Sequence, residues 1–365
     1  MKIAFLAPAN SIHTVRWVNA LAQRGHHIHL ITQHQPIDQI HSDVVIHMLP
    51  FKSLLGYFLN VFRLKKKLHN ISPQFLHVHY ASGYGTLGRL SGFYPFILSV
   101  WGNDVYDYPN NSAIHKSIII NNLFSANWVC STSEAMAKYT QNICPELRNI
   151  SITPFGIDVD KFCPIHQDKD KNSDLITVGT IKTLTPKYGV DILIKAFAQA
   201  YQNLKKTFPE IANKLRLLIV GEGKERKKLE SLTTELGIKK ITKFTGRVNH
   251  IEVPKYINYL DIYVAVSRFD SESFGVSVIE ASACCLPVIV SNVGGLPEVV
   301  KNEITGIIVE RENIQATANA IIRLIQEPIL REKMGNAGRE YVLANYEWNE
   351  NITRMEKVYE QLLST

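Results

Sequence analysis

The chain has 365 residues, of which 45% are hydrophobic and 20% are charged. This length exceeds what one hydrophobic core usually supports, so two domains are expected, and the composition excludes fibrous and disordered classes. The net charge of +7 permits an anionic partner such as a nucleic acid, a phosphorylated ligand or a membrane surface. No nucleic-acid-binding module is recognisable, so no nucleic acid is expected as a partner.

The cysteines and the start of the chain bear on its compartment. An odd number of cysteines without zinc-ligand spacing indicates reduced thiols and no metal site. These are Cys130, Cys144, Cys163, Cys284 and Cys285. Met1 to Pro8 suits a first β-strand better than a secretory signal, and no run approaches the roughly 18 apolar residues of a membrane span. We therefore expect a cytoplasmic protein.

The first half alternates short apolar runs with segments of helical period, which is typical of βα units around a parallel sheet. Val15 to Arg24 predicts a helix with its apolar residues on one face, and Gly25 predicts its C-terminal cap. Strands are expected at residues 2–7, 27–32, 75–80, 96–100 and 128–131.

The segment from Phe51 to Asn70 combines aromatic and aliphatic residues with a basic cluster, Arg63, Lys65, Lys66 and Lys67. One interpretation is a core-packed helix whose lysines complement the negative end of its dipole. The other is an amphipathic element, too short to span a bilayer, that docks on an anionic membrane. The sequence leaves both open.

A linker is expected where periodicity stops, over residues 152–164 and the polar stretch 166–174. A second βα series follows, with strands expected at residues 175–179, 215–221, 262–266 and 287–291. We therefore expect two α/β domains, each a doubly wound parallel sheet of Rossmann type, facing a central cleft. The first comprises residues 1–160, the second residues 161–347, and the amphipathic last helix, about 348–365, packs back on the first.

The segment from Arg268 to Pro287 carries the most chemical information. Gly275 opens a predicted helix whose unpaired N–H groups and positive dipole end favour a phosphate. Glu280 lies inside this otherwise apolar helix and needs hydrogen-bond donors, which a ribose diol or a neighbouring backbone or lysine group supplies. Glu272 precedes it by about two turns, so one ligand can engage both carboxylates.

These residues resemble the retaining glycosyltransferases of GT-B fold, specifically glycosyltransferase family 4, over nearly the whole chain. The E-x7-E motif of that family corresponds to Glu272 and Glu280. The other matching motifs are Val178-Gly179, Leu218 to Gly223, Phe244 to Val248, Phe155 to Asp158, and Gly294 to Glu298. Their order and spacing together are specific, whereas each alone is weak.

The resemblance implies roles for individual residues. Glu272 is expected to contact the donor sugar and Glu280 the nucleotide ribose, while the backbone at Phe274, Gly275 and Val276 holds the diphosphate. The family's usual arginine is Thr180 here, so Lys182 and Lys187 are expected to replace the basic pair, although a solvated loop lysine is the alternative for Lys182. Further donor contacts are expected at Ser273, Val248, Gly179, Arg268, Asn10 and Ser11.

Two departures from the family pattern lie in the first half. The glycine-rich first loop is replaced by Pro8 to His13, so Asn10 and Ser11 would face the phosphates. The usual His-Gly pair is Trp101-Gly102, and an indole cannot accept a proton, so Trp101 is expected to shape the sugar pocket. Asp104 is expected either to contact a sugar hydroxyl or to cap a helix.

Two patterns are interpreted as structural. Gly83 to Gly88 spells G-x-G-x-x-G, but it does not follow the first strand, which argues against a nicotinamide site. His77 and His79 share one face of a strand, but with no third ligand they are expected to line the core or the cleft.

The resemblance implies retaining transfer of a sugar from a nucleoside diphosphate sugar, with UDP favoured, to a hydroxyl acceptor. Basic residues and a helix N-terminus neutralise the diphosphate, so neither metal nor cofactor is expected. The acceptor is expected to be a glycan or lipid-linked glycan of a bacterial surface polysaccharide or lipopolysaccharide. The alternatives are an epimerase or phosphorylase on the same scaffold, or a non-enzymatic sugar-binding protein.

Overall fold

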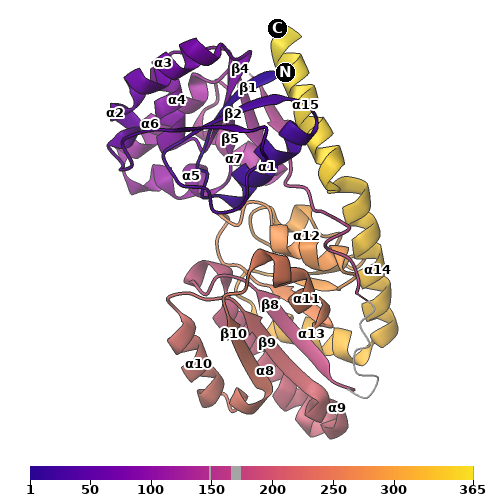
Figure 1. The fold of residues 1–365 in the computed structure, drawn as a ribbon. Coiled ribbons are helices and arrows are strands. Elements are labelled where there is room, and N and C mark those ends of the chain that lie inside the picture. Colours follow the sequence, from indigo (N-terminus) through magenta and orange to yellow (C-terminus); the bar gives the residue numbers. More distant parts are fainter. Residues whose placement is uncertain (148, 166–173, 365) are drawn as a thin grey trace. The chain divides into compact units, whose positions relative to one another are not determined.

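The computed structural model describes residues 1–147, 149–165 and 174–364. The chain divides into two compact units (Figure 1). The first unit comprises Met1–Pro154 with Asn349–Thr365, and the second unit comprises Phe155–Trp348. Both are α/β units built on a parallel sheet.

The first unit contains a seven-stranded sheet in the order β3-β2-β1-β4-β5-β6-β7, with every neighbouring pair parallel. The strands are β1 (Lys2–Leu6), β2 (His27–Thr32), β3 (Val45–Met48), β4 (Phe75–His79), β5 (Phe96–Val100), β6 (Trp128–Ser131) and β7 (Ile150–Ile152). The strand order reverses between β1 and β4, which is where ligands bind in doubly wound sheets.

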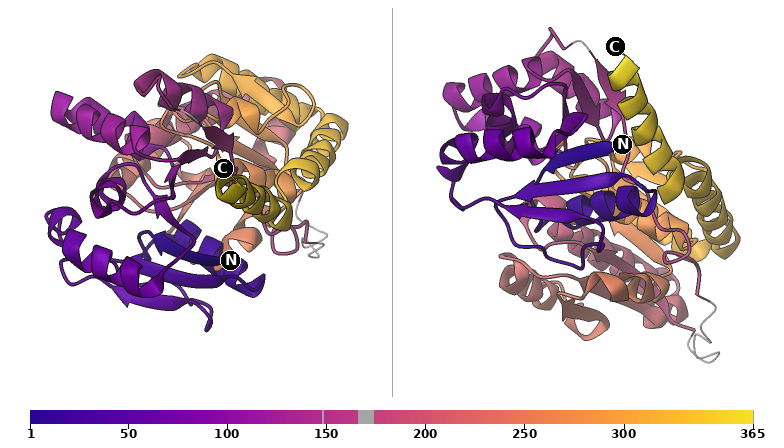
Figure 2. Two further views of the ribbon diagram at one scale, coloured as in Figure 1. Left: turned by 90° about the horizontal axis from the view of Figure 1, so that it is seen from above. Right: turned by 45° about the horizontal axis from the view of Figure 1, so that its top comes forward.

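Helices follow most strands of the first unit. They are α1 (Ile12–Gln23), α2 (Gly56–Leu59), α3 (Val61–Ile71), α4 (Gly83–Ser91), α5 (Asn103–Tyr106), η1 (Tyr108–Asn111), α6 (Ala113–Phe124), α7 (Glu134–Ile143) and α15 (Trp348–Ser364). Figure 2 shows α15 beside the N-terminal strands, with both chain ends on this unit.

The helix α15 packs on the first unit through a buried apolar stripe that includes Ile352, Met355 and Val358. Its Tyr359 is fully buried, and the hydroxyl contacts Nδ1 of His77 on β4 at 2.8 Å. This helix therefore completes the core on which β4 lies.

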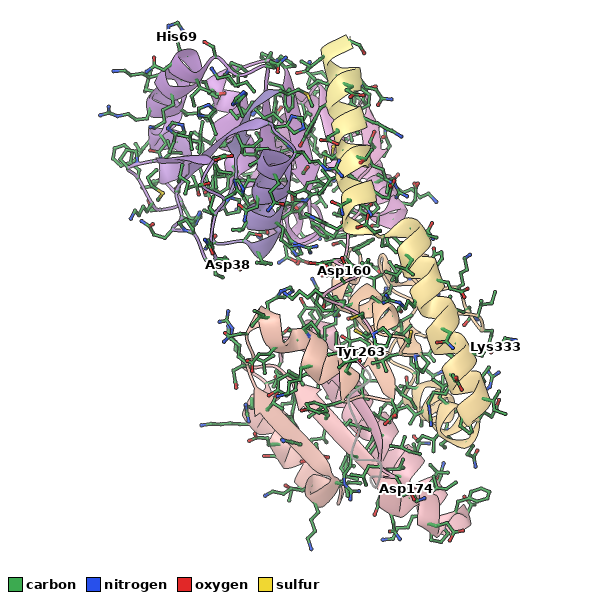
Figure 3. The ribbon with its side chains drawn as sticks, turned by 45° about the vertical axis from the view of Figure 1, so that its right-hand side comes forward. Asp38, His69, Asp160, Asp174, Tyr263 and Lys333 are labelled. Atoms are coloured by element: carbon green, nitrogen blue, oxygen red, sulfur yellow. The ribbon has the colours of Figure 1, made fainter. Side chains whose placement is uncertain are left out.

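The second unit contains a six-stranded sheet in the order β10-β9-β8-β11-β12-β13, also parallel. The strands are β8 (Ile176–Ile181), β9 (Leu215–Val220), β10 (Thr242–Gly246), β11 (Ile262–Ala265), β12 (Val288–Ser291) and β13 (Gly306–Val309). The order reverses between β8 and β11. Figure 3 shows Tyr263 of β11 inside this unit and Lys333 on its surface.

The helices of the second unit cover both faces of its sheet. They are η2 (Pro186–Tyr188), α8 (Val190–Thr207), α9 (Pro209–Lys214), α10 (Arg226–Glu235), η3 (Lys239–Ile241), η4 (His250–Glu252), α11 (Val253–Asn258), α12 (Val276–Ala283), η5 (Leu296–Glu298), α13 (Ile314–Gln326) and α14 (Pro328–Asn345).

The strands expected from apolar runs lie within one or two residues of the observed ones, whereas β3, β7, β10 and β13 were not predicted. The first helix begins at Ile12, three residues before the predicted start. Most of the polar stretch 166–174, with the pair Asp168 and Asp170, lies outside the described residues. Over the described ranges, no helix is both long and apolar enough to cross a bilayer.

Candidate active site

The carboxyl ends of β8 and β11 carry most of the predicted site residues of the second unit. Lys182 follows β8 directly, and Glu272 lies in the loop that leads from β11 to α12. The two strands are neighbours at the point where the strand order reverses. The topology alone therefore brings these two segments together at the ligand-binding edge of the sheet.

Lys182 and Glu272 form a buried ion pair, with 3.1 Å between Nζ and Oε1 and side chains only 8% and 9% exposed. The hydroxyl of Ser267 donates to the other carboxylate oxygen of Glu272 at 3.4 Å. Burial opposes the charge on Lys182, but Glu272, Tyr263 and Tyr188 together outweigh this effect and raise the pKa of the lysine above its ordinary value. Lys182 is therefore a buried cation and not a solvated loop lysine.

A second cation, Lys187, lies near the same aromatic ring as Lys182. Lys187 donates from Nζ to the carbonyl oxygen of Ser271 at 2.8 Å. The ring of Tyr188 lies 4.9 Å from Nζ of Lys182 and 5.5 Å from Nζ of Lys187, both measured to its centroid. Burial raises the pKa of Tyr188, so its hydroxyl is neutral at physiological pH. The phenol ring thus holds both ammonium groups by cation–π attraction.

The Gly294-Gly295 pair fixes the loop that carries Glu272. The N–H of Gly295 donates to the carbonyl oxygen of Glu272 at 3.0 Å, and the N–H of Gly294 donates to Asp270 at 3.1 Å. A Cβ at Gly294 would collide with the carbonyl oxygen of Glu272, and one at Gly295 with that of Ser273. Only glycine permits this approach of two backbones, so the motif after β12 positions the carboxylate.

The helix α12 begins at Val276, with Gly275 as its N-cap residue at φ +91°. A Cβ at Gly275 would lie 2.6 Å from Cδ2 of Leu296, so glycine is required both for its conformation and for space. Phe274 and Ser273 are buried directly before this entrance. The helix start that the sequence predicted for a phosphate is therefore present, four residues after Glu272.

Glu280 lies in the second turn of α12 and is buried, as its apolar neighbours predicted. Its Oε1 lies 3.5 Å from Nε2 of His250, and Nδ1 of His250 lies 3.2 Å from Nζ of Lys161. The sequence did not single out His250 or Lys161. The only signal for His250 is that it follows the Phe244 to Val248 motif by two residues. No local pattern links it to Glu280.

Arg268, which we expected to contact the donor, is bonded to other groups of the second unit, and its contact with the donor stays a prediction. Its guanidinium makes a bidentate ion pair with Asp191 of α8, at 2.7 and 2.6 Å. It also donates to Glu312 at 2.8 Å and to the carbonyl oxygen of Pro186 at 3.0 Å. With all three nitrogens bonded, Arg268 anchors the loop after β11 to α8.

The remaining predicted positions of the second unit are backbone or packing positions. Gly179 lies within β8, where a Cβ would collide with the carbonyl oxygen of Leu218 on β9. Val248 is half-buried in the segment between β10 and η4. Gly221 has φ +141° and packs against the carbonyl oxygen of Lys182, so the turn after β9 supports that lysine.

In the first unit, the predicted residues lie at the carboxyl ends of β1, β4 and β5. Asn10 is exposed, and Ser11 is the N-cap residue of α1, although its side chain makes no capping hydrogen bond. Tyr80 follows β4, and burial raises the pKa of its hydroxyl to about 12, with Asp104 adding to the shift and a hydrogen bond from Ser11 opposing it. Ser11 and Tyr80 thus meet at the reversal point between β1 and β4.

Trp101 is half-buried in an aromatic cluster at the end of β5. Its ring centroid lies 4.4 Å from that of His79, 4.9 Å from that of Tyr80 and 5.7 Å from that of His13. Burial lowers the pKa of His79 well below its ordinary value, so the imidazole is neutral. The indole therefore forms a wall, with a neutral histidine packed on it.

Asp104 is buried, and its carboxylate accepts hydrogen bonds from three backbone N–H groups, those of Ala81, Trp101 and Gly102, at 2.8 to 3.1 Å. Asp104 is the second residue of α5, whose N-cap residue is Gly102, so the prediction that Asp104 is a helix N-cap is wrong. By bonding to segments after both β4 and β5, Asp104 holds Trp101 in place. A direct contact of Asp104 with substrate stays a prediction.

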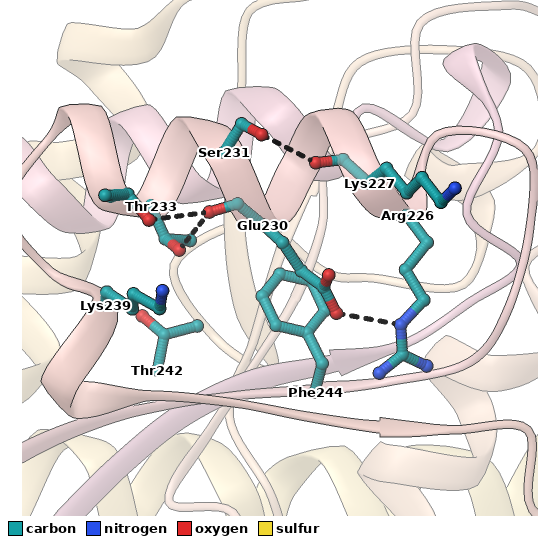
Figure 4. Close-up of a pocket in the computed structure, with 9 residues that line it drawn as sticks. Arg226, Lys227, Glu230, Ser231, Thr233, Lys239, Thr242 and Phe244 are labelled. Carbon is teal, nitrogen blue, oxygen red and sulfur yellow. Dashed lines mark hydrogen bonds and ion pairs between the residues drawn. The ribbon is translucent and has the colours of Figure 1, made fainter.

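A separate hollow of about 550 Å³ lies on the second unit between α10 and β10 (Figure 4). Its polar groups bond to one another, since Arg226 donates to Glu230 and Thr233 donates to the Glu230 carbonyl oxygen. None of the predicted site residues lines it. Across the residues that the structure describes, no group of three or more His, Cys, Asp or Glu side chains is arranged to hold a metal ion.

Comparison with known families accounts for both units. Residues 163–341 match the family model of glycosyl transferases group 1, and residues 2–133 match the model described as glycosyl transferase 4-like. The chain belongs to glycosyltransferase family 4.

The similar proteins include relatives and a solved structure. An uncharacterised glycosyltransferase of Methanocaldococcus jannaschii is 28% identical over 92% of this chain and 90% of its own. A mannosyltransferase of Corynebacterium glutamicum, named as GDP-mannose-dependent and acting on a monoacylated phosphatidylinositol monomannoside, is 32% identical over 53% of this chain and 52% of its own. The match to that enzyme therefore spans about half of each protein.

The structure of HepE from Anabaena, solved with UDP, aligns with a TM-score of 0.82 at 18% identity, covering 99% of this chain and all of HepE. At that identity the likeness shows a common fold. The glycosyltransferase therefore has the GT-B fold, with two Rossmann-like parallel-sheet domains.

Proposed function

We propose that this glycosyltransferase moves a sugar from a nucleoside diphosphate sugar to a hydroxyl acceptor, with retention at the anomeric carbon and without a metal. The observation that carries the proposal is the buried cation of Lys182, paired with Glu272 in the loop that leads into α12. Lys187 adds a second cation to the same loop through the carbonyl of Ser271. Two cations and a helix N-terminus form a site for a diphosphate.

The chemistry needs stabilisation of the leaving diphosphate more than a strong base. Lys182, Lys187 and the N–H groups of residues 274–276 neutralise the charge that develops as the bond to the sugar breaks. Glu272 accepts hydrogen bonds from sugar hydroxyls, and Glu280 accepts them from the ribose. We assign no protein general base, because the departing phosphate takes the proton of the acceptor.

We favour a UDP-sugar as donor. HepE, which shares the fold, has been solved in complex with UDP and with UDP-glucose. GDP-mannose is the second candidate, because the mannosyltransferases among the relatives are named for it. Both donors present the same diphosphate and ribose to Lys182 and Glu280, so the base decides between them.

For the acceptor we propose a glycan or lipid-linked glycan of a bacterial surface polysaccharide or lipopolysaccharide. This rests on resemblance to the family, and it places the reaction in the cytoplasm, where nucleotide sugars are the donors, or at the inner face of the cell membrane. The same fold also supports epimerases and phosphorylases, so the reaction itself has to be measured.

Proton NMR of donor turnover tests the proposal. The full-length protein is incubated with UDP-glucose, UDP-galactose, UDP-N-acetylglucosamine or GDP-mannose in EDTA, with a panel of simple sugar acceptors. We expect slow release of nucleoside diphosphate and a product with the anomeric configuration of the donor. An inverted product, or activity abolished by EDTA, would contradict the proposed mechanism. Formation of a 2-epimer would indicate an epimerase instead of a transferase, and formation of a sugar phosphate would indicate a phosphorylase.

A further inference from the structure

The start of α3 and the segment before it form an exposed apolar surface on the first unit. Leu54 and Phe62 are each 82% exposed, and Leu55, Phe58 and Leu59 are more than half exposed. Arg63, Lys65 and Lys66 are exposed beside them. We call these eight residues the α2–α3 surface.

The helix α3 does not need these residues for its packing. Its core face is formed by Leu64, Leu68 and Ile71, which are all buried. The two interpretations of the sequence therefore describe different parts of the segment. The helix α3 packs on the unit, whereas Phe62 and the apolar side chains of α2 and of the turn before it stay exposed.

The surface is held in a defined conformation. Asn60, which is fully buried between α2 and α3, donates from Nδ2 to the carbonyl oxygen of Phe51 at 2.8 Å. Gly56 packs so closely on Phe51 that a Cβ would collide with its carbonyl oxygen. The turn that presents Leu54 and Leu55 is therefore anchored at both ends. Figure 3 shows His69, near the other end of α3, at the periphery of the unit.

The charge around the surface has one sign. No aspartate or glutamate occurs between Asp43 and Asp104. Within the described part of the chain, Arg63, Lys65 and Lys66 have no ion-pair partner, in contrast to Arg226 on α10, which pairs with two glutamates. Unpaired cations beside exposed aromatic groups favour a partner that has an anionic surface and an apolar layer beneath that surface.

We propose that the α2–α3 surface docks on a bilayer that contains anionic phospholipids. Leu54, Leu55 and Phe62 enter the boundary between headgroups and acyl chains, and the basic side chains contact the headgroup phosphates. A second copy of this chain fits the surface less well, because a two-fold contact would bring the same unpaired cations together.

This inference is independent of which donor the protein uses. Only the purpose of docking rests on the proposed function, because docking would bring the enzyme to an acceptor that is carried by a lipid.

Co-sedimentation of the full-length protein with vesicles tests the proposal. We compare vesicles of phosphatidylcholine alone with vesicles that contain about 30% phosphatidylglycerol, at low salt and at about 0.5 M NaCl. We expect binding to the anionic vesicles at low salt and a loss of about tenfold or more at high salt. No binding to anionic vesicles at low salt would overturn the proposal.

Two variants separate the apolar from the basic part of the surface, and a third is a matched control. Phe58→Ser with Phe62→Ser, and separately Lys65→Ser with Lys66→Ser and Lys67→Ser, are each expected to weaken binding about tenfold or more. The control, Lys224→Ser with Lys227→Ser and Lys228→Ser, removes the same charge from the second unit and is expected to change binding less than about twofold.

If the control variant weakened vesicle binding as much as the variant with Lys65, Lys66 and Lys67 replaced, the attraction would depend on net charge alone. That result would overturn the proposal of a specific docking surface. Light scattering tests the second-copy alternative, which would be supported by a dimer that Phe58→Ser with Phe62→Ser dissociates. UDP affinity is measured for each variant in the same preparations. It should be unchanged, so failure to dock and failure of the proposed function give different results.

Discussion

At the scale of single residues, the pair formed by Lys182 and Glu272 combines stability with function. Glu272→Ala leaves a buried ammonium without its partner, which we expect to lower the free energy of unfolding by about 3 to 5 kcal/mol and to abolish turnover. Replacing both residues, as Lys182→Met with Glu272→Leu, is expected to restore most of that stability but no turnover. Urea unfolding and a donor-turnover assay measure the two effects.

Equal stability of the single and double variants would show that the ion pair is not buried as described. The pKa of Lys182 is raised in the folded protein, so its stabilising charge is fully present below about pH 10, the ordinary lysine range. The contribution of this charge to stability is lost only as the pH rises through the pKa of Lys182 in the folded protein. Titration of Lys182 therefore does not affect stability measurements near neutral pH.

In the proposed site Glu280 binds the nucleotide ribose and not the sugar, so Glu280→Ala is expected to weaken UDP binding by about 1 to 3 kcal/mol, the range of charge-assisted hydrogen bonds. Isothermal titration calorimetry measures this directly. Glu235→Ala, at the exposed end of α10, removes the same charge elsewhere on the second unit and serves as the control. Unchanged UDP affinity in Glu280→Ala would remove this residue from the ribose site.

The sequence identified the carboxylates of the site but not their partners. Glu280 was predictable because a charged residue inside an apolar helix needs a ligand or a partner. The contact of Lys182 with Glu272, and that of His250 with Glu280, join residues far apart in the chain, and no local spacing encodes them. The ion pairs of Arg268 with Asp191 and Glu312 were not predictable for the same reason.

At the scale of elements, the Gly294-Gly295 loop connects β12 to the position of Glu272. Gly294 has φ +51°, and a Cβ there would also collide with the carbonyl oxygen of Glu272. Gly294→Ala is therefore expected to displace Glu272 and to lower turnover by about tenfold or more.

Gly237→Ala is the matched control, because Gly237 has φ +71° but no atom near its Cβ position. It carries the same backbone penalty of about 1 kcal/mol without displacing a neighbour, so turnover should be preserved. Equal turnover of the two variants would show that the loop does not position the carboxylate.

Burial of His77 on β4 makes the first unit sensitive to acid. Burial lowers the pKa of His77 from 6.5 to about 3, so the unfolded chain binds a proton between these values that the folded chain does not. Stability therefore falls as the pH drops below about 6.5, by about 1.4 kcal/mol per pH unit for this group. We expect His77→Gln to lose less stability on acidification than the unmodified protein.

Urea unfolding between pH 7 and pH 4, followed by tryptophan fluorescence, measures the difference. Three of the four tryptophans, Trp17, Trp101 and Trp128, lie in the first unit, so the signal reports mainly on it. Parallel pH dependences of the two proteins would mean that His77 is not buried in its neutral form.

The order of central strands and helices was predictable because each buried strand is an apolar run of strand length. The edge strands β3, β7, β10 and β13 were not. Three of them have only three or four residues, too few for a period of their own, and β10 has a single large apolar residue, Phe244. The three residues of β7 are held by pairing with β6, and Val45 of β3 is exposed at the edge of the sheet. Such strands are defined by their neighbours and not by their own pattern.

At the scale of the whole molecule, the same topology occurs twice, and in each unit the predicted residues gather where the strand order reverses. The sequence predicted this because ligands bind at the carboxyl ends of doubly wound sheets. The second unit carries the ion pair and the helix entrance. The first carries the Trp101 cluster, held by Asp104.

The central claim is that the protein binds a nucleoside diphosphate, and a thermal-shift panel with UDP, GDP and ADP tests it most directly. At about 100 times the dissociation constant, a ligand stabilises the folded state by about 2.7 kcal/mol, which raises the unfolding temperature by several degrees. We predict the largest rise with UDP, retained in EDTA and reduced in Glu280→Ala. No rise with any of the three nucleotides would contradict the account.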